Sequence, residues 1–457
     1  MRVVLANPSP QRSLQTHRYG VGHLGLGYVA ACLLEAGHDV VVVDAKAERL
    51  DRAATVDRIQ AHSPALFGVT AMTHEIHEAA SLCAAVKERH PLCLTVVGGP
   101  HVTALPARTL REFPGIDVAV IGEGELTACD LAAAVAASPE GSRFAAIPGI
   151  AYRAGAGVHR TAARPPIADL DAVPFPAWHL FPRDVTWPVF AGRGCPFRCA
   201  FCQRVLGNRV RLRTPANVIA EFDAMQQQLG VKGTWFQDET FGVNRRWTHD
   251  LLDRMIDRNR RSGYVWHWKA NSRANIADGG LYRKMKQAGC HMLDFGIESG
   301  SPLMLKRIHK DITLSQAKRA IRLAKEAGLK TNTFFIIGHP GETWETALQT
   351  VRMAPWLGTD MIAVGIMVPY PGTEIWEFAR KGEYGYRLLS EDWRVYDKYL
   401  GNALELRGLS RRQLELLQAL TYLAFYVGTG RYRDLLEFLS KFHNEAREVL
   451  RRMCRMT

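Results

Sequence analysis

The feature that most constrains the fold is an alternation of short apolar runs with helical segments, which occurs twice along the 457 residues. In the first part of the chain, the runs are RVVLAN, DVVVVDA, ALFGVTAMT, LTVVGGPH and VAVIGEGE. Continuous β-branched runs are typical of strands that are buried on both faces of a parallel sheet. Residues 1–140 are therefore predicted to form a doubly wound, Rossmann-like α/β domain that binds ligands at the carboxyl ends of its strands.

The alternation stops in the proline-rich segment RPPIADLDAVPFPAW, residues 164–178, and resumes at Trp187. Six strand–helix units follow, with strands predicted at WPVFAG, KGTWFQDE, YVWHWKAN, HMLDFGIES, KTNTFFIIG and MIAVGIMVP. Six units predict a partial (β/α)6 TIM-type barrel. The sequence thus predicts a linker over 141–186, a partial barrel over 187–385 and a small helical C-terminal region over 386–457.

The composition limits the classes of function. A hydrophobic content of 47% and a charged content of 23% are ordinary for a soluble globular protein, and no apolar run has the length of a membrane span. The start, MRVVLANPSP, predicts a strand and not a signal peptide, so the nine cysteines indicate metal binding or buried thiols in a reducing cytoplasm. The net charge of +13 comes from dispersed arginines without an aromatic-interleaved basic run, so nucleic-acid binding is not expected.

Three cysteines stand close together in GRGCPFRCAFCQR, directly after the first predicted barrel strand. Cys195, Cys199 and Cys202 have the spacing C-x3-C-x2-C, with no fourth cysteine close behind. Cysteine thiolates hold iron–sulfur clusters, and three ligands would leave one iron of a 4Fe–4S cluster open. Zinc ligation and a buried thiol cluster are the alternatives. The position on a loop at the chemical edge of a barrel favours the catalytic cluster.

The spacing CxxxCxxC resembles the signature of the radical S-adenosylmethionine superfamily. The resemblance implies that S-adenosylmethionine chelates the open iron and is cleaved to a 5′-deoxyadenosyl radical. The motifs FQDETF, ANSR, FGIESGS, FFIIGHPGET and VPYPGT extend the resemblance through the barrel. The residues that it implies for S-adenosylmethionine binding are Phe201, Asp238, Glu239, Arg273, Glu298, Ser299 and Gly338. Judged by residue type alone, Asp238 and Glu239 could be surface carboxylates, and Arg273 could belong to a structural ion pair.

The loops GVTAMT, GGPHVTALP and GEGE resemble those of the cobalamin-binding domain that is fused to many radical S-adenosylmethionine enzymes. The residues implied for cobalamin binding are Thr70, Ala71, Met72, Thr73, Gly98, Gly99, Pro100, His101, Gly122, Glu123, Gly124 and Glu125. The chain contains no Asp-x-His, the start of the motif that places a histidine on cobalt in other cobalamin domains. His101 is therefore a candidate cobalt ligand by position only, or a turn histidine bonded to backbone. A doubly wound module that has lost cobalamin is the alternative for the whole domain.

Together, these resemblances imply a class B, cobalamin-dependent radical S-adenosylmethionine methyltransferase. Such an enzyme would methylate an unactivated carbon of a small-molecule, biosynthetic substrate through the 5′-deoxyadenosyl radical and methylcobalamin. It would also need an external electron donor of the flavodoxin or ferredoxin type. The same cofactors would suit a cyclase, a ring-contracting enzyme or an oxidising enzyme. An iron–sulfur electron carrier is the alternative outside enzymes.

Overall fold

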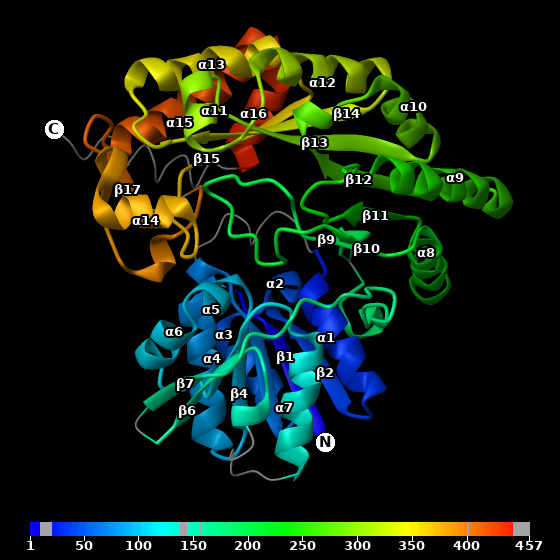
Figure 1. Cartoon of the computed structure of the whole chain (residues 1–457), viewed down its shortest axis with the longest axis vertical. Coiled ribbons are helices and arrows are strands. Elements are labelled where there is room, and N and C mark those ends of the chain that lie inside the picture. The colour runs from blue at the N-terminus through cyan, green and yellow to red at the C-terminus, as the bar shows by residue number, and fades with distance from the viewer. Residues whose placement is uncertain (10–20, 138–143, 156, 184, 400–401, 442–457) are drawn as a thin grey trace.

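The computed structural model describes residues 1–9, 21–137, 144–155, 157–183, 185–399 and 402–441. The rest of the chain lies outside this description, including 442–457 of the predicted C-terminal region and parts of the predicted linker. Two α/β units lie one above the other, and a long irregular stretch of the chain runs between them (Figure 1). Among the described helices, none combines the length and the hydropathy that are needed to span a bilayer.

The first unit is built on a seven-stranded sheet in the order β2-β1-β3-β4-β5-β6-β7. Its first five strands are parallel, as predicted: β1 (Arg2–Asn7), β2 (Asp39–Asp44), β3 (Leu66–Thr70), β4 (Leu94–Gly98) and β5 (Val118–Val120). One face packs against α1 (Leu24–Glu35) and α7 (Glu125–Ala137). The other face packs against α3 (Arg52–Gln60), α4 (Ile76–Arg89) and α6 (Pro106–Glu112), whereas α2 (Ala45–Glu48) and α5 (Pro100–Ala104) are short helices after strand ends. The β-branched runs are therefore buried on both sides.

The strands β6 (Ile150–Ala154) and β7 (Gly157–Arg160) continue this sheet as an antiparallel hairpin. They lie in the segment for which the sequence predicts a linker. The edge strand β7 is largely exposed, so it has no alternating apolar pattern that sequence analysis could detect. The first sheet thus extends to Arg160, and only the chain after it crosses to the second unit.

The second unit contains six parallel strands in the order β15-β14-β13-β12-β11-β8, as predicted. These are β8 (Pro188–Val189), β11 (Gly233–Phe236), β12 (His267–Ser272), β13 (Cys290–Glu298), β14 (Lys330–Ile337) and β15 (Met361–Ile366). The helices between them are α8 (Pro215–Leu229), α9 (Arg245–Ser262), α10 (Gly279–Gln287), α11 (Pro302–Arg307), α12 (Leu314–Glu326) and α13 (Trp344–Leu357). Within the described residues, β8 and β15 do not pair with each other. The sheet is therefore an open, partial barrel.

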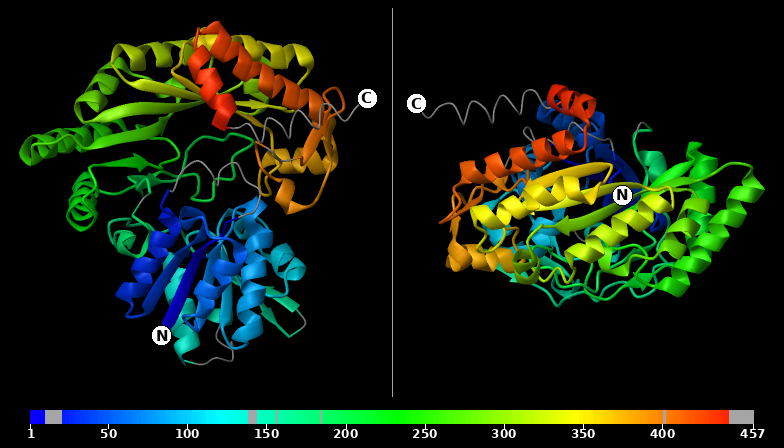
Figure 2. Two further views of the ribbon diagram at one scale, coloured as in Figure 1. Left: turned by 180° about the vertical axis from the view of Figure 1, so that it is seen from behind. Right: turned by 90° about the horizontal axis from the view of Figure 1, so that it is seen from above.

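The C-terminal region adds a small antiparallel pair, β16 (Tyr386–Leu388) and β17 (Leu404–Leu406), to the predicted helices. The helix α14 (Glu374–Lys381) precedes this pair, within the segment predicted as barrel, and α15 (Arg411–Gly428) and α16 (Tyr432–Lys441) follow it. Seen from behind, α15 and α16 (orange to red) lie across the barrel sheet (Figure 2). The Val364 N–H donates to the Tyr422 hydroxyl at 2.9 Å, and Gln418 donates to the Val364 carbonyl at 2.8 Å. Side chains of α15 therefore satisfy the backbone at the open edge of β15.

A buried ion-pair network joins the two units. Arg193 lies in β9 (Gly192–Arg193), which pairs with β10 (Arg211–Leu212) beside the cysteine loop. Its guanidinium nitrogens lie 3.0 Å from the Glu123 carboxylate and 2.7 Å from the Glu125 carboxylate. Arg211 reaches Glu123 at 2.9 Å, and the Tyr28 ring lies 4.8 Å below the Arg193 guanidinium. We call these five residues the Arg193 network.

A second contact between the units involves the 3-10 turn η7 (Trp393–Val395). The Trp393 indole donates to the Glu112 carboxylate at 2.7 Å, and Arg108 covers the same ring at 4.6 Å. The His101 ring meets Trp393 edge-on at 5.0 Å. The second unit thus contacts the first on both sides of the space between them.

We expect Arg193→Met to lower the free energy of unfolding by about 3–5 kcal/mol, because it leaves the buried Glu125 carboxylate without its partner and leaves Glu123 with Arg211 as its one remaining arginine. Chemical denaturation of the full chain measures this loss. The control Arg254→Met removes a half-exposed arginine on α9 and should change stability little. Adding Glu125→Gln to Arg193→Met should recover part of the loss, because one uncompensated charge is removed. Equal stability of Arg193→Met and the wild type would contradict this account of docking.

Candidate active site

The three predicted cluster cysteines lie on the loop that connects β9 and β10. The loop is held by backbone hydrogen bonds: the Cys195 N–H donates to the Gly207 carbonyl at 3.2 Å, and the Ala200 N–H donates to the Ile308 carbonyl at 3.0 Å. Gly194 has φ +92°, and a Cβ there would lie 2.2 Å from the Arg209 carbonyl oxygen. Only glycine therefore allows the chain to turn at this point.

The thiols lie in different environments. Cys195 and Cys202 line a large cavity between the two units, whereas Cys199 is buried. Burial and the neighbouring thiols raise the pKa of Cys202. Within the described residues, no three His, Cys, Asp or Glu side chains converge as they would around a single metal ion. A 4Fe–4S cluster is held differently, since each thiolate binds its own iron, and three separate thiols on one loop fit that arrangement.

Arg273, at the end of β12, is buried against the cysteine loop. Its Nη1 donates to Cys199 Sγ at 3.3 Å, its Nη2 donates to the Lys310 carbonyl, and the Phe197 ring lies 3.7 Å from its guanidinium carbon. The resemblance implies a role for Arg273 in S-adenosylmethionine binding. In the structure these contacts place its positive charge directly beside the Cys199 thiol.

Glu298 ends β13 with a left-handed backbone, φ +71°, at a bulge in the ladder. Its buried carboxylate pairs with Lys310 at 2.7 Å, and the Lys310 ammonium lies 5.8 Å from the Phe201 ring. A Cβ at Gly296 would lie 2.3 Å from the Glu298 carboxylate. The glycine therefore allows this carboxylate to lie back over its own strand. Since Arg273 contacts the Lys310 backbone, the structure brings Phe201, Arg273 and Glu298 together.

The remaining residues implied for S-adenosylmethionine binding are engaged in backbone contacts or in packing. Asp238 accepts a hydrogen bond from the Ala191 N–H at 3.0 Å, and burial raises its pKa to about 7. Glu239 accepts one from the Gly194 N–H at 3.1 Å and also lines the cavity. Ser299 is wholly buried against Thr350, with the two hydroxyl oxygens 3.3 Å apart. Gly338 has φ +96° and accepts a hydrogen bond from the Tyr386 hydroxyl at 2.9 Å.

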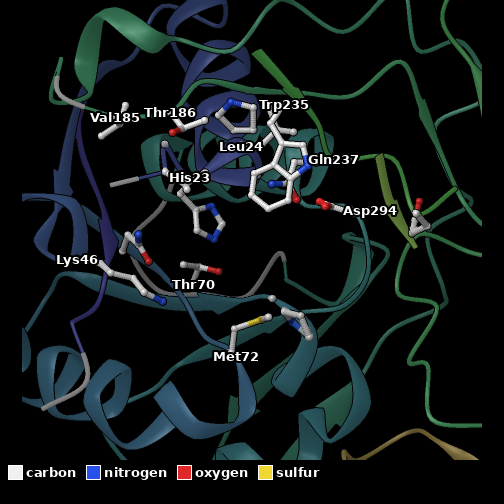
Figure 3. A pocket seen from close by; sticks show the side chains of 18 of the residues that line it. His23, Leu24, Lys46, Thr70, Met72, Val185, Thr186, Trp235, Gln237 and Asp294 are labelled. Atoms are coloured by element: carbon white, nitrogen blue, oxygen red, sulfur yellow. The ribbon is translucent and has the colours of Figure 1, made fainter. Parts of the chain in front are cut away.

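The cavity between the units has a volume of about 2690 Å³. This exceeds the roughly 300–1,000 Å³ of a site for one drug-sized ligand, so the cavity has room for several molecules. Most of the residues implied for cobalamin binding line it: Thr70, Met72, Gly98, Gly99, Pro100, Gly122, Glu123, Gly124 and Glu125. Figure 3 shows Thr70 and Met72 at its wall, opposite side chains from the barrel.

At two glycines, this cavity wall is formed by backbone without a side chain. A Cβ at Gly98 or at Gly122 would meet no atom within 4 Å, so the backbone there is open to the cavity. A large flat ligand could approach these strand ends closely, which fits the corrin of cobalamin. The Glu123 and Glu125 carboxylates, by contrast, are engaged in the Arg193 network, so their contribution here is to docking.

The structure does not bring Ala71, Thr73 or His101 to the cavity wall. Ala71 and Thr73 are buried beneath it. His101 is also buried, and its ring packs against Trp393, which comes from the other unit. Burial lowers the pKa of His101 to about 4, so the ring is neutral. His101 therefore does not face the space that cobalt would occupy.

A different histidine, His23, lines the cavity at the start of α1 (Figure 3). The Leu26 N–H donates to its Nδ1 at 3.1 Å, and burial lowers its pKa to about 4. In the neutral ring the proton is then on Nε2, which can donate a hydrogen bond but cannot ligate a metal. Lys46 and Glu75, paired at 2.7 Å, line the same region. The sequence analysis did not predict His23, Lys46 or Glu75 as site residues. The one feature that could have indicated this site is the position of His23 directly before a predicted helix.

Comparisons with known proteins agree with this arrangement. Residues 15–132 match the family model of the B12 binding domain, and residues 189–354 match that of the Radical SAM superfamily. The uncharacterized methyltransferase PH0819 of Pyrococcus horikoshii is 34% identical over 437 residues, which is 93% of each chain. The anaerobic magnesium-protoporphyrin IX monomethyl ester cyclase of Rubrivivax gelatinosus is 32% identical over 77% of this chain and 65% of that protein.

Two solved structures have a similar fold. The radical S-adenosylmethionine methyltransferase TsrM from Kitasatospora setae, with cobalamin and a [4Fe–4S] cluster bound, has a TM-score of 0.74 and 21% identity, covering 93% of this chain and 90% of that one. The cobalamin-dependent enzyme OxsB has a TM-score of 0.74 and 15% identity, covering 92% and 66%. The chain therefore belongs to the cobalamin-binding radical S-adenosylmethionine methyltransferase family, as predicted, and the cofactors of this family are a 4Fe–4S cluster, S-adenosylmethionine and cobalamin.

We expect electron paramagnetic resonance of the cob(II)alamin-loaded protein to show no coupling to a histidine nitrogen of the chain. The reasons are the buried position of His101 and the protonated Nε2 of His23. Protein labelled with ¹⁵N in histidine should give the same cobalt hyperfine pattern as unlabelled protein, and so should His101→Asn. A pattern that changed with the histidine label would show that a histidine ligates cobalt.

Proposed function

We propose that this protein transfers a methyl group to an unactivated carbon of a small-molecule substrate. The observation that carries the proposal is the single cavity between the two units. Its barrel wall contains the thiols of Cys195 and Cys202, and its opposite wall contains the smooth strand ends of the first unit. A substrate in this cavity would therefore be within reach of both cofactor sites.

When bound, the cluster and S-adenosylmethionine supply a hydrogen-abstracting radical, and cobalamin supplies the methyl group. Cys195, Cys199 and Cys202 would hold the cluster, and Arg273, whose Nη1 lies 3.3 Å from Cys199 Sγ, would place a positive charge beside it. The Glu298–Lys310 pair presents opposite charges close to this loop, which suits the charged ends of an amino acid. Phe201, beside Lys310, offers an aromatic face.

The first unit would hold cobalamin through backbone and small side chains. Gly98 and Gly122 allow close approach, and Thr70 offers a hydroxyl at the cavity wall. The His23 Nε2–H and the Lys46 ammonium are donors that suit the amide carbonyls at the rim of a corrin. The Arg193 network keeps this wall at a set distance from the cysteine loop.

The second candidate function is a cyclisation or oxidation with the same cofactors. It is favoured by the 32% identity to a magnesium-protoporphyrin IX monomethyl ester cyclase. A purely electron-carrying role is less consistent with a cavity of about 2690 Å³ beside the cysteine loop. We further propose that the protein works in the cytoplasm with a flavodoxin or a ferredoxin as electron donor, since the eight described cysteines are all free.

The cluster assignment predicts that anaerobically reconstituted wild-type protein contains about four irons per chain. Cys→Ala at position 195, 199 or 202 should abolish S-adenosylmethionine cleavage and lower the iron content. Cys290→Ala, which changes a buried thiol at the start of β13, is the matched control and should retain iron. Production of 5′-deoxyadenosine by the triple alanine variant would refute the assignment.

The methyl-transfer proposal predicts similar amounts of 5′-deoxyadenosine and S-adenosylhomocysteine per turnover, because one S-adenosylmethionine yields the radical and another donates its methyl group. S-adenosylmethionine labelled in that methyl group should pass its label to the product, as mass spectrometry would detect. A cyclisation or an oxidation would instead give 5′-deoxyadenosine with no matching S-adenosylhomocysteine and an unlabelled product. That result would favour the second candidate.

A further inference from the structure

The inner face of the barrel sheet carries a row of polar side chains that neither cofactor site explains. Asp294 on β13 is in register with Asn271 on β12 and with Asn332 on β14. Along each strand these positions alternate with residues that pack against the outer helices, so the row faces the inside of the barrel. Asp294 and Asn332 line the large cavity, together with Gln237 and Lys269.

Two acceptors of this row lack partners. Asp294 is only 3% exposed, yet its Oδ1 accepts no hydrogen bond from any described residue, and the same holds for Asn332 Oδ1. A buried polar atom without a partner costs about 1–3 kcal/mol. Two such atoms on adjacent strands, both in a cavity wall, therefore indicate a site for a donor from outside the chain. Burial also raises the pKa of Asp294, which shows how little this carboxylate is solvated.

The surrounding charges and spacing define the donor. Lys269 lies two residues before Asn271 on β12, and its ammonium is 3.8 Å from the centre of the Trp235 ring. Its positive charge interacts favourably with the negative charge of Asp294. Asp294, Asn332 and Lys269 together carry a net charge close to zero. The two unpaired oxygens therefore need hydrogen-bond donors more than they need a positive charge. Adjacent strands are about 4.8 Å apart, and one nitrogen with two or three hydrogens can serve both oxygens. A hydroxyl has a single hydrogen and can serve only one.

We propose that Asp294 and Asn332 bind a primary amine or primary amide nitrogen of the substrate. The inference rests on the proposed function and deepens it, because it names a substrate class: small molecules with a nitrogen-bearing head group, as opposed to hydrocarbons. Figure 3 shows Asp294 and Gln237 on the barrel wall of the cavity, away from Lys46 and Met72 of the first unit. The head group would therefore bind on the barrel floor, and the rest of the substrate would extend toward the cofactors.

The test uses benzylamine, benzamide and toluene as probes, because they share a ring and differ in the group attached to it. Crystals of the cofactor-loaded protein are soaked with each probe. We expect the nitrogen of benzylamine and of benzamide within hydrogen-bond distance of Asp294 Oδ1 and Asn332 Oδ1, and no toluene there. Only water at the two oxygens in every soak, or toluene bound on the row, would overturn the proposal.

Affinities in solution provide a second measurement, by ligand-observed NMR titration. Asp294→Asn and Asn332→Leu should each weaken benzylamine binding roughly tenfold or more, since the first removes the negative charge and one carboxylate oxygen, and the second removes the Asn332 acceptor together with its hydrogen bond to Asp294. The control Asp253→Asn changes an exposed carboxylate on α9 and should bind as the wild type does. Iron and cobalamin contents equal to those of the wild type show that the variants are folded and loaded. Unchanged benzylamine affinity in both loaded variants would contradict the assignment.

These results separate the subsite from the proposed function. If benzylamine binds on the row but the enzyme yields no methylated product, the subsite stands and methyl transfer fails. If a methylated product forms from a substrate without a nitrogen head group, methyl transfer stands and the subsite fails.

Discussion

The structure depends on the burial of Arg193 between two carboxylates of the other unit. An unpaired buried charge costs several kcal/mol, so Arg193, Glu123 and Glu125 are satisfied only when the two units are docked. Arg193 lies two residues before Cys195 on the same short strand and loop. Docking therefore fixes the position of the cysteine loop relative to the strand ends of the first unit. This network, together with the Trp393 contact, holds the two walls of the cavity in place.

Left-handed backbone occurs at two positions beside the cysteine loop. Gly194 precedes the first cysteine with φ +92°, and Glu298 adopts φ +71° although it has a side chain. A left-handed non-glycine residue costs of order 1–3 kcal/mol and persists only where its surroundings hold it. Glu298 is held in this conformation by its ion pair with Lys310 and by the contact between His339 and its backbone carbonyl. The left-handed backbone places the Glu298 carboxylate beside the cysteine loop. An ordinary extended strand end would direct this side chain elsewhere.

The sequence predicted what depends on neighbouring residues and missed what depends on distant ones. The β-branched runs and the cysteine spacing are local, so the parallel strands and the order of the barrel units were predictable. Glu123 was assigned to cobalamin because its arginine partner follows 70 residues later and has no local signal. His101 was a candidate ligand by position, but Trp393 from the other unit buries it. The polar row around Asp294 likewise arises from strand register, which three separate segments determine together.

The proposed role of Asp294 also bears on how a substrate would lie in the cavity. Asp294, on the barrel floor, and Glu298, beside the cysteine loop, are four residues apart on one strand. At about 3.3 Å per residue, their backbones are about 13 Å apart. The Glu298 carboxylate lies back over Gly296, so a substrate held at Asp294 would extend along β13 for less than this separation before it met that carboxylate. With the head group at Asp294, one strand would carry both the site for the polar end of the substrate and the carboxylate beside the cysteine loop.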